Sequence, residues 1–278
     1  MIIDNKYKII KKLKSGAFGS VFKCENIRTS EFVAIKFEDK NNEMKTIKNE
    51  AKIYQYLGNI DGFPHLKWFG TNEQFNYLAI NLLGSSLSEM ITYYKAFSLK
   101  TVLLIGIQLI RRIQTLHDNS ILHRDIKPDN FLFGLGTDTN KLYLIDFGFA
   151  KRYEYNGKHI EEKHINNIIG SQNFVSLNVH NGIEPSRRDD IESCIYIILN
   201  MLLGNLEWFD TNIDKYKIPL LKKQILLLNE VPSFIKIMLC YVRAIKFNET
   251  PDYEYLVILM TKIFYENNYK NDGQFEWV

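Results

Sequence analysis

Cysteine is scarce in this chain, which has only Cys24, Cys194 and Cys240 among its 278 residues. An odd number of widely spaced cysteines in apolar surroundings argues against a disulfide framework and a cysteine-based metal site, and predicts buried reduced thiols. The sequence also lacks any run near the roughly 18 apolar residues of a membrane span, and its first residues form no apolar signal segment. We therefore expect a globular intracellular protein, cytoplasmic or nuclear, with no membrane partner.

Neither sign of charge dominates, since 35 basic residues face 32 acidic ones for a formal net charge of +3. That balance does not indicate nucleic-acid binding, so we expect no nucleic-acid partner. Low-complexity linkers, internal repeats and proline-rich segments are absent as well, so domain division has to be read from a change in secondary-structure pattern.

The pattern changes near Leu83. Before it, short runs rich in Val, Ile and Phe predict strands at Tyr7–Leu13, Val21–Asn26, Phe32–Phe37 and Phe75–Leu82. Apolar residues at helical spacing predict one helix over Glu43–Leu57, which Gly58 ends. After Leu83 long helices dominate, and the longest, Leu99–His117, is apolar enough to be buried on most sides. We expect one α+β domain over 1–278, with a small antiparallel-sheet lobe at about 1–82 and a larger, mainly helical lobe at about 83–278.

A glycine-bearing turn joins the first two predicted strands, with the sequence Lys14-Ser15-Gly16-Ala17-Phe18-Gly19-Ser20-Val21. Glycines in such a turn let backbone N–H groups approach phosphate oxygens without a Cβ clash. Two glycines between strands are also common in ordinary hairpins, so this turn alone is a weak signal.

Lys36 lies in the apolar strand segment Val33-Ala34-Ile35-Lys36, where its neighbours would bury its ammonium. A buried ammonium requires a compensating carboxylate, and Glu50, on the predicted helix, is the candidate. The plainer alternative is a strand lysine that reaches solvent and a solvated helix glutamate.

Two polar motifs after Leu83 lie next to short apolar runs, Phe131–Phe133 and Leu142–Ile145. The motifs are His123-Arg124-Asp125-Ile126-Lys127-Pro128-Asp129-Asn130 and Asp146-Phe147-Gly148. Phosphoryl transfer needs a carboxylate near the attacking hydroxyl, oxygen ligands for magnesium and a cation near the developing charge. Asp125 would be the carboxylate near the hydroxyl, and Lys127 would be the cation. Asn130 and Asp146 would be the oxygen ligands for magnesium. A polar loop with Asx turns is the alternative interpretation.

These motifs together resemble those of protein kinases, and the longer runs resemble the casein kinase 1 family over essentially the whole chain. The matching runs include 82–87, 97–104, 123–133, 182–193, 251–253 and 275–277. Where other kinases carry Ala-Pro-Glu, this chain has Ser176-Leu177-Asn178, similar to the Ser-Ile-Asn of that family. Without the glutamate, the usual ion pair that anchors the activation segment cannot form, so another anchor is required. Asp190 is a candidate to hold the catalytic-loop backbone, or to cap its own helix.

The resemblance implies a bilobal protein-kinase fold, ATP and Mg²⁺ as cofactors, and transfer to serine or threonine hydroxyls of proteins without activation-loop phosphorylation. The implied catalytic residues are Asp125, Lys127, Lys36 and Glu50, and the implied metal ligands are Asn130 and Asp146. The implied nucleotide-binding residues are Leu13, Ser15, Gly16, Ala17, Phe18, Gly19, Val21, Ala34, Lys36, Ile80, Asn81, Leu83, Leu132 and Ile145. The aliphatic members of this set could equally be core residues.

Two positions depart from the family pattern. Lys14 replaces the first glycine of the nucleotide-covering loop, for which we expect reduced but not abolished ATP affinity. Asn173 stands where the family usually has an arginine that binds phosphate on primed substrates, and an amide cannot replace a bidentate guanidinium. Priming is therefore left open. The basic residues Lys151, Arg152, Arg187 and Arg188 either favour acidic substrates or form an ordinary solvated face.

Two other functions stay open. A pseudokinase would bind nucleotide or partners without turnover, and a small-molecule phosphotransferase would share the Asp, Asn and Asp pattern but not Lys127. A tyrosine kinase is disfavoured, because Lys127 two residues after Asp125 is typical of the serine/threonine pattern. We expect a monomer that acts on protein substrates.

Overall fold

A computed structural model describes residues 1–16 and 19–277. The chain forms two compact units, the first made of residues 1–85 with 132–150 and the second of residues 86–131 with the chain from 151 onward. The segment 132–150 thus belongs with the N-terminal part of the chain, which the expected boundary near residue 82 did not anticipate.

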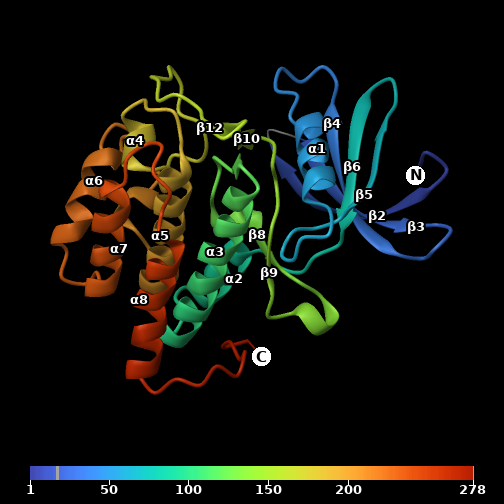
Figure 1. Ribbon diagram of the computed structural model, residues 1–278. Coiled ribbons are helices and arrows are strands. Elements are labelled where there is room, and N and C mark those ends of the chain that lie inside the picture. Colours follow the sequence, from blue (N-terminus) through green and yellow to red (C-terminus); the bar gives the residue numbers. More distant parts are fainter. Residues whose placement is uncertain (17–18, 278) are drawn as a thin grey trace. The chain divides into compact units, whose positions relative to one another are not determined.

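The first unit is built on a six-stranded antiparallel sheet (Figure 1). In spatial order its strands are β1 (Ile2–Ile3), β2 (Tyr7–Gly16), β3 (Gly19–Asn26), β4 (Phe32–Asp39), β6 (Phe75–Asn81) and β5 (Leu66–Thr71). The four strands predicted from the sequence are confirmed. The short β1 and the edge strand β5 were not predicted.

Alternation along β4 divides the sheet into a core face and a second face. Val33, Ile35 and Phe37 are buried in the core of the first unit. Ala34 and Lys36 are one residue out of step, so they lie on the opposite face. The same core contains Tyr7, Cys24, Tyr77 and Ala79. Each large apolar side chain buried in this way contributes about 1.5–3 kcal/mol, and this fixes the register that presents Lys36 on the second face.

The helix α1 (Ile47–Leu57) packs against this sheet, with contacts to β5 and β6. It begins four residues later than the predicted Glu43, because the buried Glu38 carboxylate of β4 accepts the backbone N–H groups of Thr46 at 2.6 Å and Ile47 at 2.9 Å. Those N–H groups have no partner within the helix. Gly58 follows the last residue with φ of +57° and confirms the predicted end.

The segment 132–150 is attached to the first unit by backbone hydrogen bonds. Strand β8 (Phe131–Phe133) pairs with β9 (Leu142–Leu144). The Gly84 N–H donates to the Phe133 carbonyl at 2.8 Å, and the Phe133 N–H donates to the Ser85 carbonyl at 3.0 Å. Asp146, two residues after β9, is therefore placed in the first unit.

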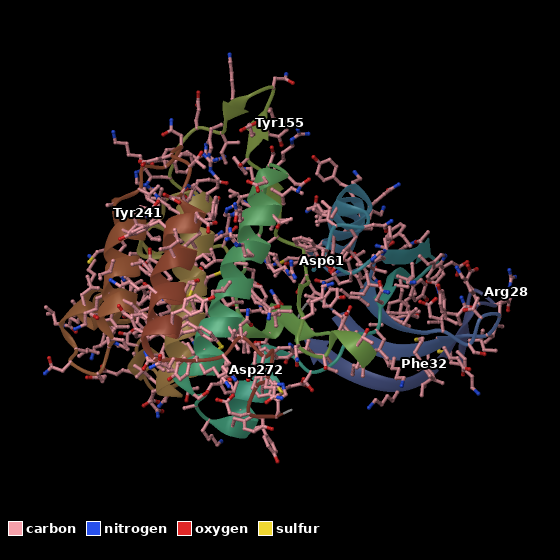
Figure 2. All side chains as sticks on the ribbon, turned by 60° about the horizontal axis from the view of Figure 1, so that its bottom comes forward. Arg28, Phe32, Asp61, Tyr155, Tyr241 and Asp272 are labelled. Carbon is pink, nitrogen blue, oxygen red and sulfur yellow. The ribbon has the colours of Figure 1, made fainter. Side chains whose placement is uncertain are left out.

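The second unit is mainly helical, as expected. Its helices are α2 (Leu87–Tyr94), α3 (Leu99–Asp118), α4 (Leu177–His180), α5 (Arg187–Leu203), α6 (Ile218–Gln224), α7 (Ser233–Ala244) and α8 (Tyr253–Glu266). Short strands β7 (Ile121–Leu122) and β10 (Lys151–Arg152) pair, as do β11 (Glu154–Tyr155) and β12 (Lys158–His159). Tyr155 projects from the hairpin of β11 and β12, and Tyr241 lies on α7 (Figure 2).

Helices α3 and α5 form the centre of the second unit. The predicted helix Leu99–His117 is confirmed as α3, and it contacts both α5 and α8. Every residue of α5 from Asp189 to Met201 is buried. This is unusual for acidic residues, and it points to polar partners for Asp189, Asp190 and Glu192.

Two further findings concern the apolar helices and the cysteines. None of the helices in the described part of the chain combines the length and apolar character needed to cross a bilayer. Cys24 and Cys194 are buried, but Cys240 on α7 is exposed, so the expectation of three buried thiols was wrong for that residue.

Candidate active site

Lys36, in β4, has its ammonium bound by two carboxylates. Nζ lies 2.7 Å from Glu50 Oε2 on α1 and 2.8 Å from Asp146 Oδ1. The Lys36 side chain is 14% exposed and that of Glu50 only 4%, so the ion pair compensates charges that would otherwise be buried alone. The pairing expected from the sequence is present. Asp146 is a second partner that the sequence reasoning did not include.

Both members of this pair have shifted pKa values. Burial alone would lower the pKa of Lys36, but the charges of Glu50 and Asp146 raise it above its ordinary value. Burial raises the pKa of the Glu50 carboxyl, and the nearby Lys36 ammonium opposes that rise. At 2.7 Å and with two carboxylates around it, Lys36 stays charged at neutral pH, and this favours the ionised form of Glu50.

Asp146 is held in an uncommon backbone conformation, with φ of +66°. Its N–H donates to the hydroxyl of Tyr54 at 3.2 Å. The next residue, Phe147, is fully buried and packs edge-on against the Tyr54 ring, with centroids 5.0 Å apart. The Asn49 side-chain amide donates to the Phe147 and Ala150 carbonyls. These contacts fix the direction of the Asp146 carboxylate, a positioning the sequence alone did not reveal.

Four residues of the predicted nucleotide set share the face of the sheet opposite its core. Val21 pairs with Lys36 across β3 and β4, and Ala34 pairs with Ile80 across β4 and β6. Directly opposed residues of antiparallel strands lie on the same face, and so do residues two apart. All four are partly exposed, not buried. That exposure favours a binding surface over plain core for Val21, Ala34 and Ile80.

The glycine-bearing turn is described only at its ends. Leu13, Ser15 and Gly16 are exposed at the end of β2, which continues through the positions expected to form the turn. Ala17 and Phe18 lie outside the described residues. Gly19 has φ of +125°, and a Cβ there would lie 1.9 Å from the Phe37 carbonyl oxygen, so a side chain is excluded at this position.

The remaining nucleotide candidates are also in the first unit. Leu132 belongs to β8, Ile145 directly follows β9, and both are partly exposed. Asn81, the last residue of β6, accepts the His65 N–H with its side chain at 2.8 Å. Leu83 lies two residues after β6 and is partly exposed.

Asp125 is the centre of polar contacts in the second unit. Its buried carboxylate accepts the N–H of Ser171 at 2.9 Å and the hydroxyl of Ser171 at 2.8 Å, both at Oδ1. Oδ2 lies 2.6 Å from Lys127 Nζ, which also lies 3.2 Å from the Ser171 hydroxyl. An acid, an ammonium and a hydroxyl thus converge here, although only the first two were expected.

Asn130, a predicted metal ligand, lies in the 3₁₀ turn η1 (Pro128–Asn130) and is buried. Its amide nitrogen donates to the Asp125 carbonyl at 2.8 Å, so the other end of the amide, the oxygen, is the atom suited to a hard cation. Among the described residues, no group of three or more His, Cys, Asp or Glu side chains could hold a metal. The assignment of Asn130 and Asp146 as metal ligands stays a prediction.

Asp190 holds the backbone of the loop that begins at His123, which is the first of the two roles expected for it from the sequence. Its carboxylate accepts the N–H groups of His123 at 2.7 Å and Arg124 at 2.9 Å. His117 Nε2 lies 3.1 Å from the same carboxylate. The expectation that Asp190 caps α5 was wrong, because Ser186 occupies the N-cap and its N–H donates to Asp189 at 2.8 Å.

Glu184 is a buried carboxylate surrounded by cations of the second unit. Oε1 lies 2.7 Å from Lys151 Nζ and 3.4 Å from an Arg124 nitrogen, and Oε2 lies 3.9 Å from Lys163 Nζ. Glu184 is 3% exposed. The basic residue Lys151, read from the sequence as part of a basic face, therefore serves in part as a counterion.

The segment Ser176-Leu177-Asn178 is anchored by a carboxylate from α5, and not by one of its own. Asp189 Oδ1 accepts the Ser176 hydroxyl at 2.6 Å and the Asn178 amide at 3.1 Å. Asp189 is buried, which raises its pKa, whereas the hydrogen bonds from Ser176 and Ser186 lower it. The alternative anchor that the sequence required is thus Asp189.

Four contributors were not singled out from the sequence: Tyr54, Ser171, Glu184 and Asp189. Glu184 and Asp189 lie inside the run 182–193 that carries the family resemblance. The signal that could have identified Asp189 is its position in the first turn of a strongly apolar helical run, where acidic residues require partners.

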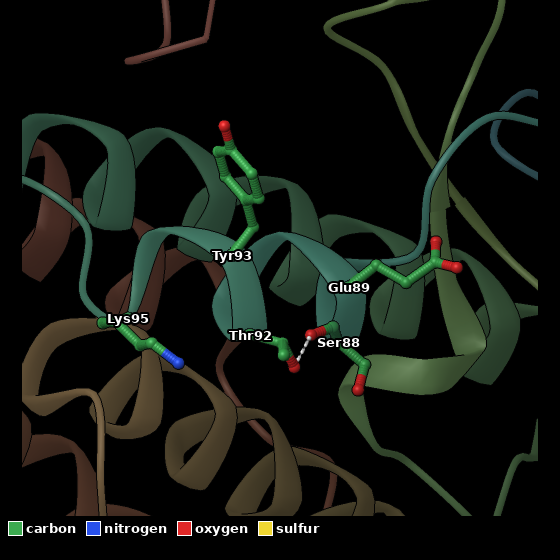
Figure 3. A pocket seen from close by; sticks show the side chains of 5 residues that line it. All are labelled: Ser88, Glu89, Thr92, Tyr93 and Lys95. Carbon is green, nitrogen blue, oxygen red and sulfur yellow. Dashed lines mark hydrogen bonds between the residues drawn. The ribbon is translucent and has the colours of Figure 1, made fainter.

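A surface hollow on α2 lies apart from these residues. It is lined by Ser88, Glu89, Thr92, Tyr93 and Lys95, and the Thr92 hydroxyl donates to the Ser88 carbonyl within it (Figure 3). None of the predicted site residues contributes to it, and we assign it no chemistry.

Comparison with known families assigns the fold. A family model described as protein kinase domain matches residues 7–260, nearly the whole chain. The six-stranded antiparallel sheet with one helix and the helical second unit agree with this assignment, and the α+β fold class is confirmed. On this match, the chain belongs to the protein kinase domain family.

Proposed function

We propose that this protein transfers the γ-phosphoryl group of ATP to serine or threonine hydroxyls of protein substrates. One observation carries the proposal: Asp125 Oδ1 accepts a seryl hydroxyl, that of Ser171, at 2.8 Å, while Oδ2 binds the Lys127 ammonium at 2.6 Å. A carboxylate that already accepts one aliphatic hydroxyl beside an ammonium is suited to accept the proton of another.

In this proposal Asp125 orients the acceptor hydroxyl and takes its proton, while Lys127 offsets negative charge on the transferred group. Lys36 binds phosphate oxygens of the nucleotide, and Glu50 holds Lys36 in place for that contact. Val21, Ala34 and Ile80 contact the adenine through the partly exposed face of the sheet. The remaining nucleotide-binding residues keep the roles implied by the family resemblance.

Magnesium fits the donor atoms present, since Asn130 offers an amide oxygen and Asp146 a carboxylate, both hard ligands. Oδ1 of Asp146 also binds the Lys36 ammonium. When bound, the ion would neutralise phosphate charge. The protein's own contribution is to hold these oxygens still: Tyr54 and the positive φ fix Asp146, and the Asp125 carbonyl fixes Asn130.

A casein kinase 1-like specificity is supported by sequence features. The feature specific to that family is Ser176-Leu177-Asn178 in place of Ala-Pro-Glu, whereas Lys127 two residues after Asp125 supports serine/threonine specificity in general. We propose protein substrates, with acidic residues near the acceptor as the class to test, and a monomer that requires no nucleic acid or membrane. The proposed compartment is cytoplasmic or nuclear.

Activity without loop phosphorylation is part of the proposal, and Glu184 supports it. A phosphate on an activation loop acts by pairing with arginine and lysine side chains. Here the buried Glu184 carboxylate already pairs with Arg124 and Lys151. A carboxylate supplied by the fold would take the place of the added phosphate.

The decisive experiment measures transfer of labelled phosphate from magnesium ATP to degenerate serine, threonine and tyrosine peptides and to casein. We expect wild type to label serine and threonine peptides, with acidic sequences preferred. Asp125→Asn should lose transfer by about a hundredfold or more, and Asp118→Asn, an exposed acid at the end of α3, should match wild type. Nucleotide binding without transfer by wild type would instead indicate a pseudokinase.

A further inference from the structure

Lys222 of α6 is a lysine that the proposed reaction does not use, and no carboxylate of the described residues contacts its buried ammonium. Nζ donates to the Val175 carbonyl at 2.7 Å and to the Gln172 carbonyl at 3.0 Å, and lies 3.2 Å from His180 Nε2. The side chain is completely buried. Burying an ammonium is costly, and an apolar side chain such as methionine would fill the space more cheaply.

The residues around Lys222 favour its charged form only in part. The rings of Tyr196 and Trp208 lie 4.6 Å and 5.9 Å from Nζ, within the range of cation–π attraction. Two charged groups face it from neighbouring helices, Glu192 of α5 and Arg243 of α7. These two bind each other at 3.1 Å, so neither gives Lys222 a carboxylate of its own.

The two carbonyls that Lys222 binds belong to one turn. The Ser171 carbonyl accepts the N–H groups of Phe174 at 2.8 Å and Val175 at 3.0 Å, which closes residues 171–175 into a compact turn. Ser171 is also the residue whose N–H and hydroxyl bind Asp125. Lys222 thus holds the end of the turn at Val175, while Asp125 holds its beginning at Ser171.

Lys222 is itself fixed to the interior of the helical unit. Its backbone carbonyl accepts a hydrogen bond from Arg243 at 2.9 Å, and Arg243 also contacts Glu192 and the Tyr196 hydroxyl. The ion pair between Arg243 and Glu192 therefore joins helices of the second unit to each other. The Lys222 ammonium connects these helices to the turn 171–175.

From this arrangement we infer that Lys222 is a positioning residue, which holds the turn 171–175 so that a protein substrate can place its hydroxyl at Asp125. The inference rests on the proposed function. It assigns to Lys222 the anchoring that an activation-segment glutamate would otherwise provide, with Asp189 anchoring the following residues Ser176 and Asn178. Because the turn binds Asp125, its displacement should affect the peptide and not ATP.

The test compares Lys222→Met with Lys223→Met, its exposed neighbour on the same helix, and with Lys222→Gln, which keeps an N–H donor. Steady-state kinetics are measured separately for peptide and ATP. We expect Lys222→Met to lower kcat/KM for the peptide by about ten- to a hundredfold, with KM for ATP unchanged. Lys222→Gln should recover part of the loss, and Lys223→Met should behave like wild type.

Hydrogen exchange provides a second readout that does not depend on turnover. Amides of residues 171–176 should exchange faster in Lys222→Met than in Lys223→Met, while those of α3 stay protected. If Lys222→Met does not fold, Lys222→Gln carries both measurements. The inference would be refuted if Lys222→Met changed neither the peptide kinetics nor the hydrogen exchange. It would also be refuted if kcat/KM fell equally for the peptide and for ATP while amides throughout the protein lost protection. Absence of transfer by wild type would refute the proposed function instead, and exchange would still decide the role of Lys222.

Discussion

The carboxylate of Asp190 accepts the backbone N–H of His123 at 2.7 Å, so the first residue of the catalytic-loop motif is held by the start of helix α5. The same carboxylate accepts the N–H of Arg124, a residue with φ of +68°. A non-glycine residue in that region costs about 1–3 kcal/mol and persists only when its surroundings enforce it. Asp190 is part of that enforcement.

Replacing Asp190 with asparagine should destabilise the protein and reduce its activity. The amide nitrogen would face N–H groups of His123 and Arg124, which leaves a buried donor without an acceptor. We expect a loss of about 2–4 kcal/mol in the free energy of unfolding, measured by urea denaturation. The surviving folded fraction should show a lower kcat. A variant with wild-type stability and kcat would show that the loop is held by other contacts.

Glu184→Gln should weaken the cation cluster that we propose replaces loop phosphorylation. Removing one charge takes away a carboxylate that pairs with Arg124 and Lys151, at a cost of about 3 kcal/mol in stability. We expect the variant to have a lower kcat than wild type when both proteins have been treated with phosphatase. Glu161→Gln, an exposed acid nearby in sequence, is the control. Phosphatase sensitivity of wild type itself would contradict the role given to Glu184.

Local patterns predicted the elements well where one physical rule dominates. Alternation of Val33, Ile35 and Phe37 decided the register of β4, and that register places Lys36 on the face opposite the core. Glu50 was the candidate partner of Lys36 because a buried ammonium requires a carboxylate, but the alternative of two solvated side chains was left open until the 2.7 Å contact decided between them.

Contacts between distant segments could not be predicted in this way. Ser171 lies 46 residues from Asp125, and no periodicity relates the two. The start of α1 was misplaced because Glu38, a buried acid on β4, caps it from outside the helix. The return of residues 132–150 to the first unit depends on backbone bonds to Gly84 and Ser85. Such contacts depend on tertiary packing, which the local patterns do not encode.

Lys14→Gly should restore the first glycine of the nucleotide-covering loop. Lys14 is exposed near the end of β2 and is paired across the strands with Val21. Glycine there lets the backbone approach phosphate more closely. We therefore expect KM for ATP to fall by a few-fold, with KM for the peptide unchanged. Lys11→Gly, also exposed on β2, controls for loss of positive charge and for strand flexibility. An unchanged KM for ATP would mean that Lys14 does not weaken nucleotide binding.

Gly170→Ala should distort the joint between the turn 171–175 and the catalytic loop. Gly170 has φ of +97°, and a Cβ there would lie 2.5 Å from the Arg124 carbonyl oxygen. Gly157 also has positive φ, +75°, but a Cβ there meets nothing within 4 Å. Strain alone costs each variant about 1–3 kcal/mol. We expect Gly170→Ala to lose more stability than Gly157→Ala, measured by urea denaturation, and to have a lower kcat as well. Equal losses of stability in the two variants would show that the close contact with Arg124 is easily relieved.

Lys222 should make the stability of the protein depend on pH. Burial lowers the pKa of Lys222 to about 7; Arg243 also lowers it, whereas Glu192 raises it. A lysine in the unfolded chain has a pKa of about 10.4, so between these two values the unfolded state binds more protons than the folded state. The free energy of unfolding therefore rises with pH across this window, by at most about 1.4 kcal/mol per pH unit.

The linkage is measured by urea denaturation of wild type, Lys222→Met and Lys223→Met between pH 6.5 and 9. His180, which contacts Lys222, has a pKa lowered to about 4 by burial and by the Lys222 charge, so it stays neutral throughout. We expect wild type and Lys223→Met to gain stability relative to Lys222→Met as pH rises. A difference that is constant with pH would mean that Lys222 keeps its charge in the folded protein, held by the two carbonyls and the aromatic rings around it.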